Sequence, residues 1–226
     1  KIGRDPEEDM EIVRAVREAV GPKANIRIDP NQAWSSSYAV RMIRKLEEYR
    51  LEFVEQPVPR WDVEGLCAVR GKVDTPICAC ELAWDHKDIF EIIRNRAADI
   101  INVDIHRAGG ILECKKQIHA AQIAGLPCGL HTSGSFGPGT AAALHLAASS
   151  VNMPLAIELI YDWFADDIIT SPFQMTPTMK VPESPGLGVE LDEEKLKRYM
   201  EKEITEGWTT RSTPVEIPIP PPRFWL

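Results

Sequence analysis

Six ionisable residues recur along the sequence at nearly equal intervals, and each ends an apolar stretch. They are Asp29, Glu55, Glu81, Asp104, His131 and Glu158, which by subtraction lie 26, 26, 23, 27 and 27 residues apart. One strand-and-helix unit of an eightfold α/β barrel occupies roughly 25–30 residues. Because the carboxyl ends of the strands in such a barrel meet on one face, the six groups would surround a single pocket.

Three of these groups are successive carboxylates that could bind a divalent cation. Asp29, Glu55 and Glu81 would repel one another in a shared pocket unless a cation neutralised them. Oxygen ligands with open coordination positions suit a hard ion such as Mg²⁺. Any one of the three could instead cap a helix or pair with a lysine, but their equal spacing at strand ends favours a Mg²⁺ site.

The remaining groups could move protons. Asp104 would accept a hydrogen bond from one nitrogen of His131 and leave the other nitrogen as a general base. Glu158 could donate or accept a proton opposite the metal. Lys1 would lie at the strand end before Asp29, on the face opposite His131. These groups suit removal of the α-proton of a carboxylate substrate, with the enediolate stabilised by Mg²⁺ and neighbouring donors.

Alternating helix and strand patterns would position these residues. Helices are predicted over residues 6–20, 36–49, 62–71, 86–97, 110–124, 138–150 and 192–202. Strands are predicted over residues 26–29, 51–55, 76–81, 100–104, 126–131 and 155–158. This alternation indicates parallel β/α units. A doubly wound sheet alternates in the same way, but the sequence contains no GxGxxG or GxxxxGK[ST] phosphate loop, so a barrel is preferred.

The composition excludes several classes of partner. The 226 residues carry a net charge of −8, which argues against a nucleic acid or an anionic membrane surface as the main partner. No apolar run approaches the roughly 18–20 residues of a membrane span. The five cysteines contain no CxxC pair, which favours reduced thiols in a cytoplasmic protein. We expect Cys78 and Cys80 to be structural, one facing the barrel interior and the other facing the helices.

At these positions the sequence resembles the enolase superfamily and, within it, the mandelate racemase subgroup. The resemblance covers residues 1 to about 200, and the motifs occur in the order that the subgroup has. They are Asp29-Pro30-Asn31, Glu55-Gln56-Pro57, Glu81, Asp104 with Gly109-Gly110, His131, Glu158 and the turn Pro185-Gly186-Leu187-Gly188-Val189. The family resemblance thus rests on the same strand ends as the spacing argument.

The resemblance implies an α/β fold, a TIM-type (β/α)7β barrel that is incomplete in this chain. Residues 1–190 would supply strands three to eight and a stub of strand two. The first strand, most of the second and an N-terminal α+β capping domain would be absent. Residues 191–226 would form a C-terminal helix and a Pro-rich tail that packs on the capping domain. A homo-oligomer is also expected.

The resemblance also implies a role for each site residue. Mg²⁺ would bind the three carboxylates, His131 and Asp104 would form the base, and Lys1 would be the second lysine of a Lys-x-Lys motif. Glu158 would occupy the eighth-strand position. We expect the substrate to contact Asn31 and, in the glycine-containing loop after His131, Ser133.

The subgroup contains dehydratases of sugar acids and racemases, and we expect the former. The reaction would be a hydro-lyase step in carbohydrate acid catabolism, giving a 2-keto-3-deoxy acid, with His131 as base and then acid. A racemase or epimerase of a 2-hydroxy acid is the alternative, with Lys1 and His131 each serving one face. A non-catalytic binding or assembly module is the alternative from another class, which the complete set of strand-end residues disfavours.

Two positions narrow the assignment within the superfamily. Asp104 stands where the muconate-lactonizing subgroup usually carries a lysine, which argues against that subgroup. Asn31 stands where galactonate and mannonate dehydratases tend to have a histidine, which weakens those two assignments.

Overall fold

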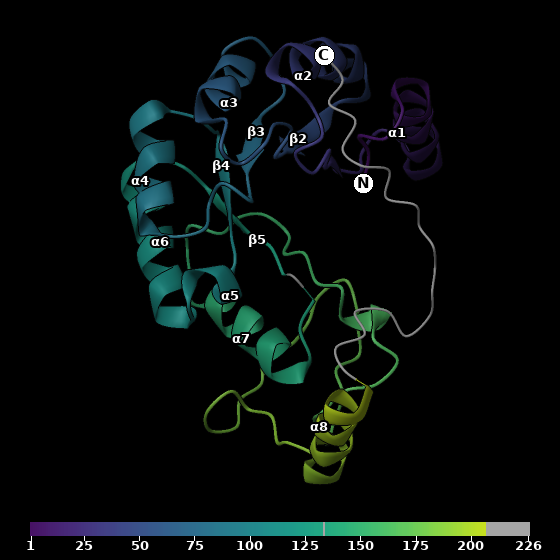
Figure 1. Cartoon of the computed structure of the whole chain (residues 1–226), viewed down its shortest axis with the longest axis vertical. Coiled ribbons are helices and arrows are strands. Elements are labelled where there is room, and N and C mark those ends of the chain that lie inside the picture. Colours follow the sequence, from purple (N-terminus) through teal and green to yellow (C-terminus); the bar gives the residue numbers. More distant parts are fainter. Residues whose placement is uncertain (133, 207–226) are drawn as a thin grey trace.

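The fold is built on a curled sheet of five parallel strands, seen in a computed structural model that describes residues 1–132 and 134–206 (Figure 1). Each strand pairs with the next one in the chain. The strands are β1 (Ile26–Ile28), β2 (Leu51–Glu55), β3 (Ile77–Ala79), β4 (Ile100–Val103) and β5 (Cys128–Leu130). This arrangement is a half-barrel, and it confirms the predicted α/β fold with an incomplete TIM-type barrel.

Helices connect the strands, as the sequence pattern predicts. They are α1 (Pro6–Val20), α2 (Ser36–Leu46), η1 (Glu47–Tyr49), α3 (Val63–Arg70), α4 (His86–Asn95), α5 (Ile105–Ala108), α6 (Ile111–Ile123), α7 (Gly137–Ala148), η2 (Tyr161–Trp163) and α8 (Glu193–Glu206). Side-chain caps begin several of them: Asp5 accepts from the backbone N–H groups of Glu7 and Glu8, and Asp85 forms a capping box with Asp88. No helix among the described residues is long and apolar enough to cross a membrane.

The sheet has two apolar faces of very different size. The outer face packs against the helices and forms the main core, in which Ile43, Leu66, Ile89 and Ile101 are almost fully buried. The inner face carries a small separate cluster of buried residues, made of Phe53, Cys78 and Ile100, with Leu155 packed against it. The outer core holds the strands in place, so the inner face is free to carry polar groups at the strand ends.

The expectation that Cys78 and Cys80 face opposite sides was wrong. Cys78 belongs to the inner apolar cluster, and Cys80 lies on the same side, next to Glu55 and His131. Residues two apart along an extended chain point to the same face, which is the reason for this placement.

The predicted strand at 155–158 is not a strand in the structure. This segment runs beside β5, because Glu158 N–H donates to Leu130 O (3.0 Å) and Cys128 N–H donates to Asn152 O (2.9 Å). Pro154 has no N–H to offer to a ladder. The inner-face residue Arg27 donates to Ala156 O (2.7 Å) from β1. Thr132 Oγ1 also donates to Glu158 O. Single backbone and side-chain hydrogen bonds therefore hold the segment without a regular ladder.

The other departures from the predicted elements are smaller. The predicted helix 36–49 ends as the 3₁₀ turn η1, and the short helix α5 directly after Asp104 was not anticipated. The division at residue 190 into a barrel and a tail stays a prediction, and residues 207–226 of that tail lie outside the described residues.

Candidate active site at the carboxyl ends of the strands

The predicted site residues follow the strands and so lie at one edge of the sheet. Asp29 follows β1, Glu55 ends β2, Glu81 follows β3, Asp104 follows β4 and His131 follows β5. Because all five strands are parallel, their carboxyl ends lie on the same side of the molecule. The spacing argument therefore placed these side chains on the correct edge.

A chain of polar contacts links the first and third carboxylates. Lys1 Nζ forms an ion pair with Asp29 Oδ2. The other oxygen of Asp29 accepts from the backbone N–H of Asn31 (2.6 Å), and Asn31 Nδ2 donates to Glu81 Oε1 (2.5 Å). Asn31 has φ 51°, a left-handed conformation that asparagine tolerates better than most residues. Asn31, expected at the substrate, therefore orients Glu81 in the structure.

Gln56 fixes the second carboxylate relative to the third. Its side chain is fully buried, and Oε1 accepts from the backbone N–H groups of Cys80 (3.0 Å) and Leu82 (3.1 Å). Its Nε2 donates to Val58 O (2.9 Å). The two bonds that Oε1 accepts tie the end of β2 to the loop that carries Glu81, and the bond from Nε2 holds the segment after β2 in place. Sequence reasoning quoted Gln56 only as part of a motif and missed this function.

The electrostatics of the carboxylates are those of an uncompensated negative site. Glu55 is 3% exposed, and its pKa is raised from 4.5 to about 7 by burial and then by the charges of Asp29 and Glu158. Burial lowers the pKa of Lys1, but Asp29, Glu55 and Glu81 outweigh this effect and the net shift is upward. These mutual effects show that the carboxylates and Lys1 act within one electrostatic neighbourhood.

The residues present fit a divalent cation. Glu81 Oε2 is buried and has no hydrogen-bond donor among the described residues, so one carboxylate oxygen is available as a ligand. The raised pKa of Glu55 shows that its charge lacks sufficient compensation. A hard cation with oxygen ligands would relieve both features, and the ligands would be Asp29, Glu55 and Glu81. Lys1 and Asn31 hold two of these carboxylates, Asp29 and Glu81, through the ion pair and the hydrogen bond described above.

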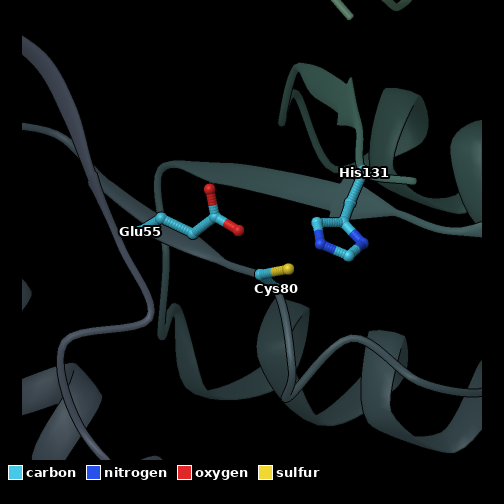
Figure 2. Close-up of side chains that lie close together, drawn as sticks. All are labelled: Glu55, Cys80 and His131. Carbon is cyan, nitrogen blue, oxygen red and sulfur yellow. The ribbon is translucent and has the colours of Figure 1, made fainter. Parts of the chain in front are cut away.

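The closest set of potential metal ligands differs from the predicted one. Among the described residues, ligand atoms of Glu55, Cys80 and His131 all lie within 4.8 Å of one another (Figure 2). Among the same described residues, the carboxylate oxygens of Asp29, Glu55 and Glu81 do not form such a compact group. Like charges that no cation bridges repel one another, which is a physical reason for their separation.

His131 has the partner that the sequence predicts. Its Nδ1 donates to Asp104 Oδ2 (3.0 Å), and the Asp104 side chain is completely buried. Asp104 Oδ1 accepts from the backbone N–H of His106 (2.7 Å) and lies 3.2 Å from His106 Nδ1. A buried carboxylate with several donors is held rigidly, so it fixes the orientation of the imidazole. This arrangement leaves Nε2 of His131 free of Asp104.

Arg107 connects the histidine to the third strand. Its Nη1 donates to Cys80 O (3.0 Å) and lies 3.3 Å from Cys80 Sγ, and its Nη2 lies 3.3 Å from His131 Nδ1. Its guanidinium also packs over the ring of Trp84, 5.5 Å from the centroid. From the sequence alone, a pocket position and a surface position are equally compatible with Arg107 and His106. The signal that identifies them is their position in α5, two and three residues after Asp104.

Two further predicted residues have different outcomes. Glu158 lies close enough to raise the pKa of Glu55, and its backbone O accepts from Thr132 Oγ1 (2.7 Å). Ser133, predicted to contact the substrate, lies outside the described residues. Apart from Ser133, the structure thus brings the candidate residues together, whereas their roles in catalysis stay predictions.

Comparison with known proteins identifies the family. Residues 1–195 match the family described as enolase C-terminal domain-like. A chloromuconate cycloisomerase of Cupriavidus necator is 36% identical over 202 residues, which cover 88% of this chain and 55% of that protein. A hydrophobic dipeptide epimerase of Enterococcus faecalis is 35% identical, with 84% and 54% covered. The chain spans about half the length of these curated relatives.

Solved structures agree with this result. An isomerase of Streptomyces coelicolor has a TM-score of 0.86 and is 38% identical, with 91% of this chain and 55% of that chain covered. An enolase of Thermobispora bispora, solved with magnesium and formate, has a TM-score of 0.83 at 27% identity, with 91% and 49% covered. Members of the superfamily use a lysine or histidine base together with Mg²⁺.

The comparisons correct two expectations and support the family assignment. Three of the four relatives named above are a cycloisomerase, an epimerase and an isomerase, so the preference for a lyase acting in sugar-acid catabolism is not supported. Asp104 was expected to set this chain apart from the muconate-lactonizing subgroup. The 36% identity with a chloromuconate cycloisomerase shows that the chain is nevertheless similar to such an enzyme over most of its length. The match over residues 1–195 and the strand-end motifs agree. The chain belongs to the enolase superfamily, within its mandelate racemase subgroup.

Proposed function

We propose that the protein is a Mg²⁺-dependent racemase or epimerase that moves the proton on the carbon next to a carboxylate. The observation that carries this proposal is the placement of two proton-transfer groups on either side of the carboxylates. Both lie at the carboxyl ends of the strands: Lys1 contacts Asp29 beyond β1, the first strand of the sheet, and His131 follows β5, the last strand. An enzyme that inverts a carbon needs one group on each face of that carbon.

The three carboxylates would hold the cation in this proposal. Asp29, Glu55 and Glu81 supply oxygen ligands, and Asn31 orients Glu81 through its 2.5 Å hydrogen bond. When bound, Mg²⁺ supplies positive charge that makes the α-proton of a substrate carboxylate more acidic. The protein's own contribution is a fixed, largely buried set of ligands that keeps the substrate between the two bases.

His131 would exchange a proton with one face of the substrate carbon through Nε2. Asp104 keeps the other nitrogen protonated and stabilises the imidazolium that forms when His131 takes a proton. Lys1 would return a proton to the opposite face, since its ammonium is held in the site by Asp29. Removal at one face and return at the other inverts the carbon, and the reverse sequence restores it.

The substrate proposed is a small carboxylate with a polar substituent on its α-carbon. Relatives include an N-succinyl-L-Arg/Lys racemase of Bacillus cereus, 31% identical over 199 residues. An enolase of Mycobacterium smegmatis at 28% identity was solved with tartrate, a 2-hydroxy acid. N-succinyl amino acids and 2-hydroxy acids both have a carboxylate with a hydrogen on the neighbouring carbon. These likenesses support an isomerase acting on such acids better than a sugar-acid dehydratase.

Incubation in D₂O with Mg²⁺ tests the proposed reaction. The panel would contain 2-hydroxy acids, N-succinyl amino acids, dipeptides and hexonic and hexaric acids. The proposal predicts, for at least one class, deuterium at the α-carbon of both stereoisomers and no keto product. Release of water with a 2-keto product from the turned-over acid would contradict it and favour dehydration. A homo-oligomer is proposed as well, and light scattering of the purified protein would test it.

A further inference from the structure

Cys80 is a potential metal ligand that the proposed reaction does not use. Its side chain is fully buried, and Figure 2 shows its sulfur directed into the space between Glu55 and His131. The ligand atoms of these three residues lie within 4.8 Å of one another. They come from β2, from the end of β3 and from the end of β5, so three separate segments place them together.

The three donors differ chemically from the carboxylates that suit Mg²⁺. A thiolate, an imidazole and a carboxylate together favour zinc and similar ions, whose affinity for such sites exceeds that of hard cations. Zinc sites with three protein ligands keep a fourth position for water. Bonds of about 2.0–2.3 Å in a tetrahedral site separate the ligands by about 3.3–3.8 Å, so the side chains would move inward by about 1 Å.

The imidazole is already oriented as a zinc ligand requires. Figure 2 shows one ring nitrogen of His131 facing Glu55 and Cys80 and the other facing away. Nδ1 donates to the buried Asp104 at 3.0 Å, which leaves Nε2 as the coordinating atom. A carboxylate behind a metal-bound histidine is the usual partner in zinc sites, since it fixes the ring and raises its basicity.

The surrounding charges permit a cation at this position. Arg107 Nη1 lies 3.3 Å from Cys80 Sγ and opposes a cation there. Lys1 adds a second positive charge near Glu55. Against these two charges stand three carboxylates: Glu55 and Glu81 raise the pKa of Cys80, and Asp104 and Glu81 raise the pKa of Arg107. A guanidinium N–H can also donate to a metal-bound sulfur and remain in place.

We propose that Glu55, Cys80 and His131 form a site for Zn²⁺ that competes with Mg²⁺ and blocks the enzyme. Zn²⁺ takes the Nε2 lone pair of His131 and one carboxylate that Mg²⁺ needs, and the thiol proton of Cys80 leaves to solvent. Binding itself is independent of the reaction, whereas the inhibition rests on the proposed function.

Cobalt binding tests the site without an activity assay. Co²⁺ added to the metal-free protein is expected to give a sulfur-to-cobalt charge-transfer absorption band, and Zn²⁺ is expected to remove it. Cys80→Ser should lack the band and bind Zn²⁺ at least about tenfold more weakly. Loss of a residue that only hydrogen-bonds to a metal ligand already weakens metal binding by about tenfold, and Cys80 is a ligand itself. Cys78→Ser is the matched control, because Cys78 is buried on the same strand face two residues earlier and should keep the band.

The inhibition is measured separately as the Zn²⁺ concentration that halves each variant's own Mg²⁺-dependent proton exchange. That concentration is expected to rise at least about tenfold in Cys80→Ser and to stay unchanged in Cys78→Ser. Absence of the band in the wild-type protein, or its retention in Cys80→Ser, would overturn the site. A band without any Mg²⁺-dependent exchange would leave the site standing and refute the proposed function instead.

Discussion

Replacing Glu55 by glutamine should stabilise the metal-free protein at pH 8. Glu55 is 3% exposed, and burial together with the charges of Asp29 and Glu158 raises its pKa from 4.5 to about 7. A shift of about 2.5 pH units corresponds to about 3 kcal/mol in the free energy of unfolding. Glutamine has nearly the same shape and no charge, so it removes this penalty while filling the same space.

The pH dependence has a definite sign. The folded protein holds the Glu55 proton more tightly than the unfolded chain does, so this group favours folding fully only below pH 4.5. That contribution is lost as the pH rises towards 7. The advantage of Glu55→Gln over the wild type should therefore be about 1 kcal/mol or less at pH 5 and about 3 kcal/mol at pH 8.

Mg²⁺ should reverse this order of stabilities. At a concentration about 1,000 times the dissociation constant, binding to the folded state alone adds about 4.1 kcal/mol to the wild-type protein, which exceeds the advantage of about 3 kcal/mol that the variant has at pH 8. Glu55→Gln lacks one of the three proposed ligands and should gain little. The exposed residue Glu11 provides a control, because Glu11→Gln should respond to pH and Mg²⁺ as the wild type does.

Urea unfolding at pH 5 and pH 8, with EDTA or with Mg²⁺, measures all of these differences. The reasoning is refuted if Glu55→Gln is no more stable than the wild type at pH 8 in EDTA. It is equally refuted if Mg²⁺ stabilises the variant and the wild type by the same amount.

Three further substitutions test the supporting contacts. Asp104→Asn should lower kcat by about 10²–10⁴-fold because His131 loses the carboxylate charge that fixes its tautomer and stabilises the imidazolium, and unchanged proton exchange in D₂O would contradict this. Asn31→Ala should weaken Mg²⁺ binding by about 10–100-fold because Glu81 loses its donor, and a calorimetric titration giving wild-type affinity would exclude that role. Gln56→Leu should reduce the free energy of unfolding by about 3 kcal/mol, since three backbone groups lose their partner. A urea midpoint equal to that of the wild type would count against that bridge.

The positions of the site residues could be predicted because the strand periodicity fixes them. When each apolar strand of a parallel sheet is followed by a polar residue, these residues must lie together at the carboxyl ends of the strands. Asp29, Glu55 and His131 therefore lie where the sequence predicts. The segment 155–158 has the same apolar pattern, yet it forms no ladder among the described residues. It is held by single hydrogen bonds to Leu130, Arg27 and Thr132. Strand character there depends on neighbours as well as on the residues themselves.

The contacts that orient the site were harder to predict. Arg107 reaches Cys80, and Gln56 joins two strand ends, through side-chain geometry that the spacing of residues does not contain. The type of reaction was not determined either. Lys1 and His131 can serve both a dehydration and an inversion, so the choice between them came from the relatives.

Proton exchange by variants that lack one base tests the central claim most directly. With an acid that the wild-type protein isomerises in D₂O, His131→Asn and Lys1→Met should each lose isomerisation. Each should still exchange the α-proton of one stereoisomer, and the two variants should act on opposite stereoisomers. His119→Asn and Lys23→Met alter exposed residues and serve as controls. If both variants exchange the same stereoisomer, or if either still isomerises the acid at the wild-type rate, the two-base account is contradicted.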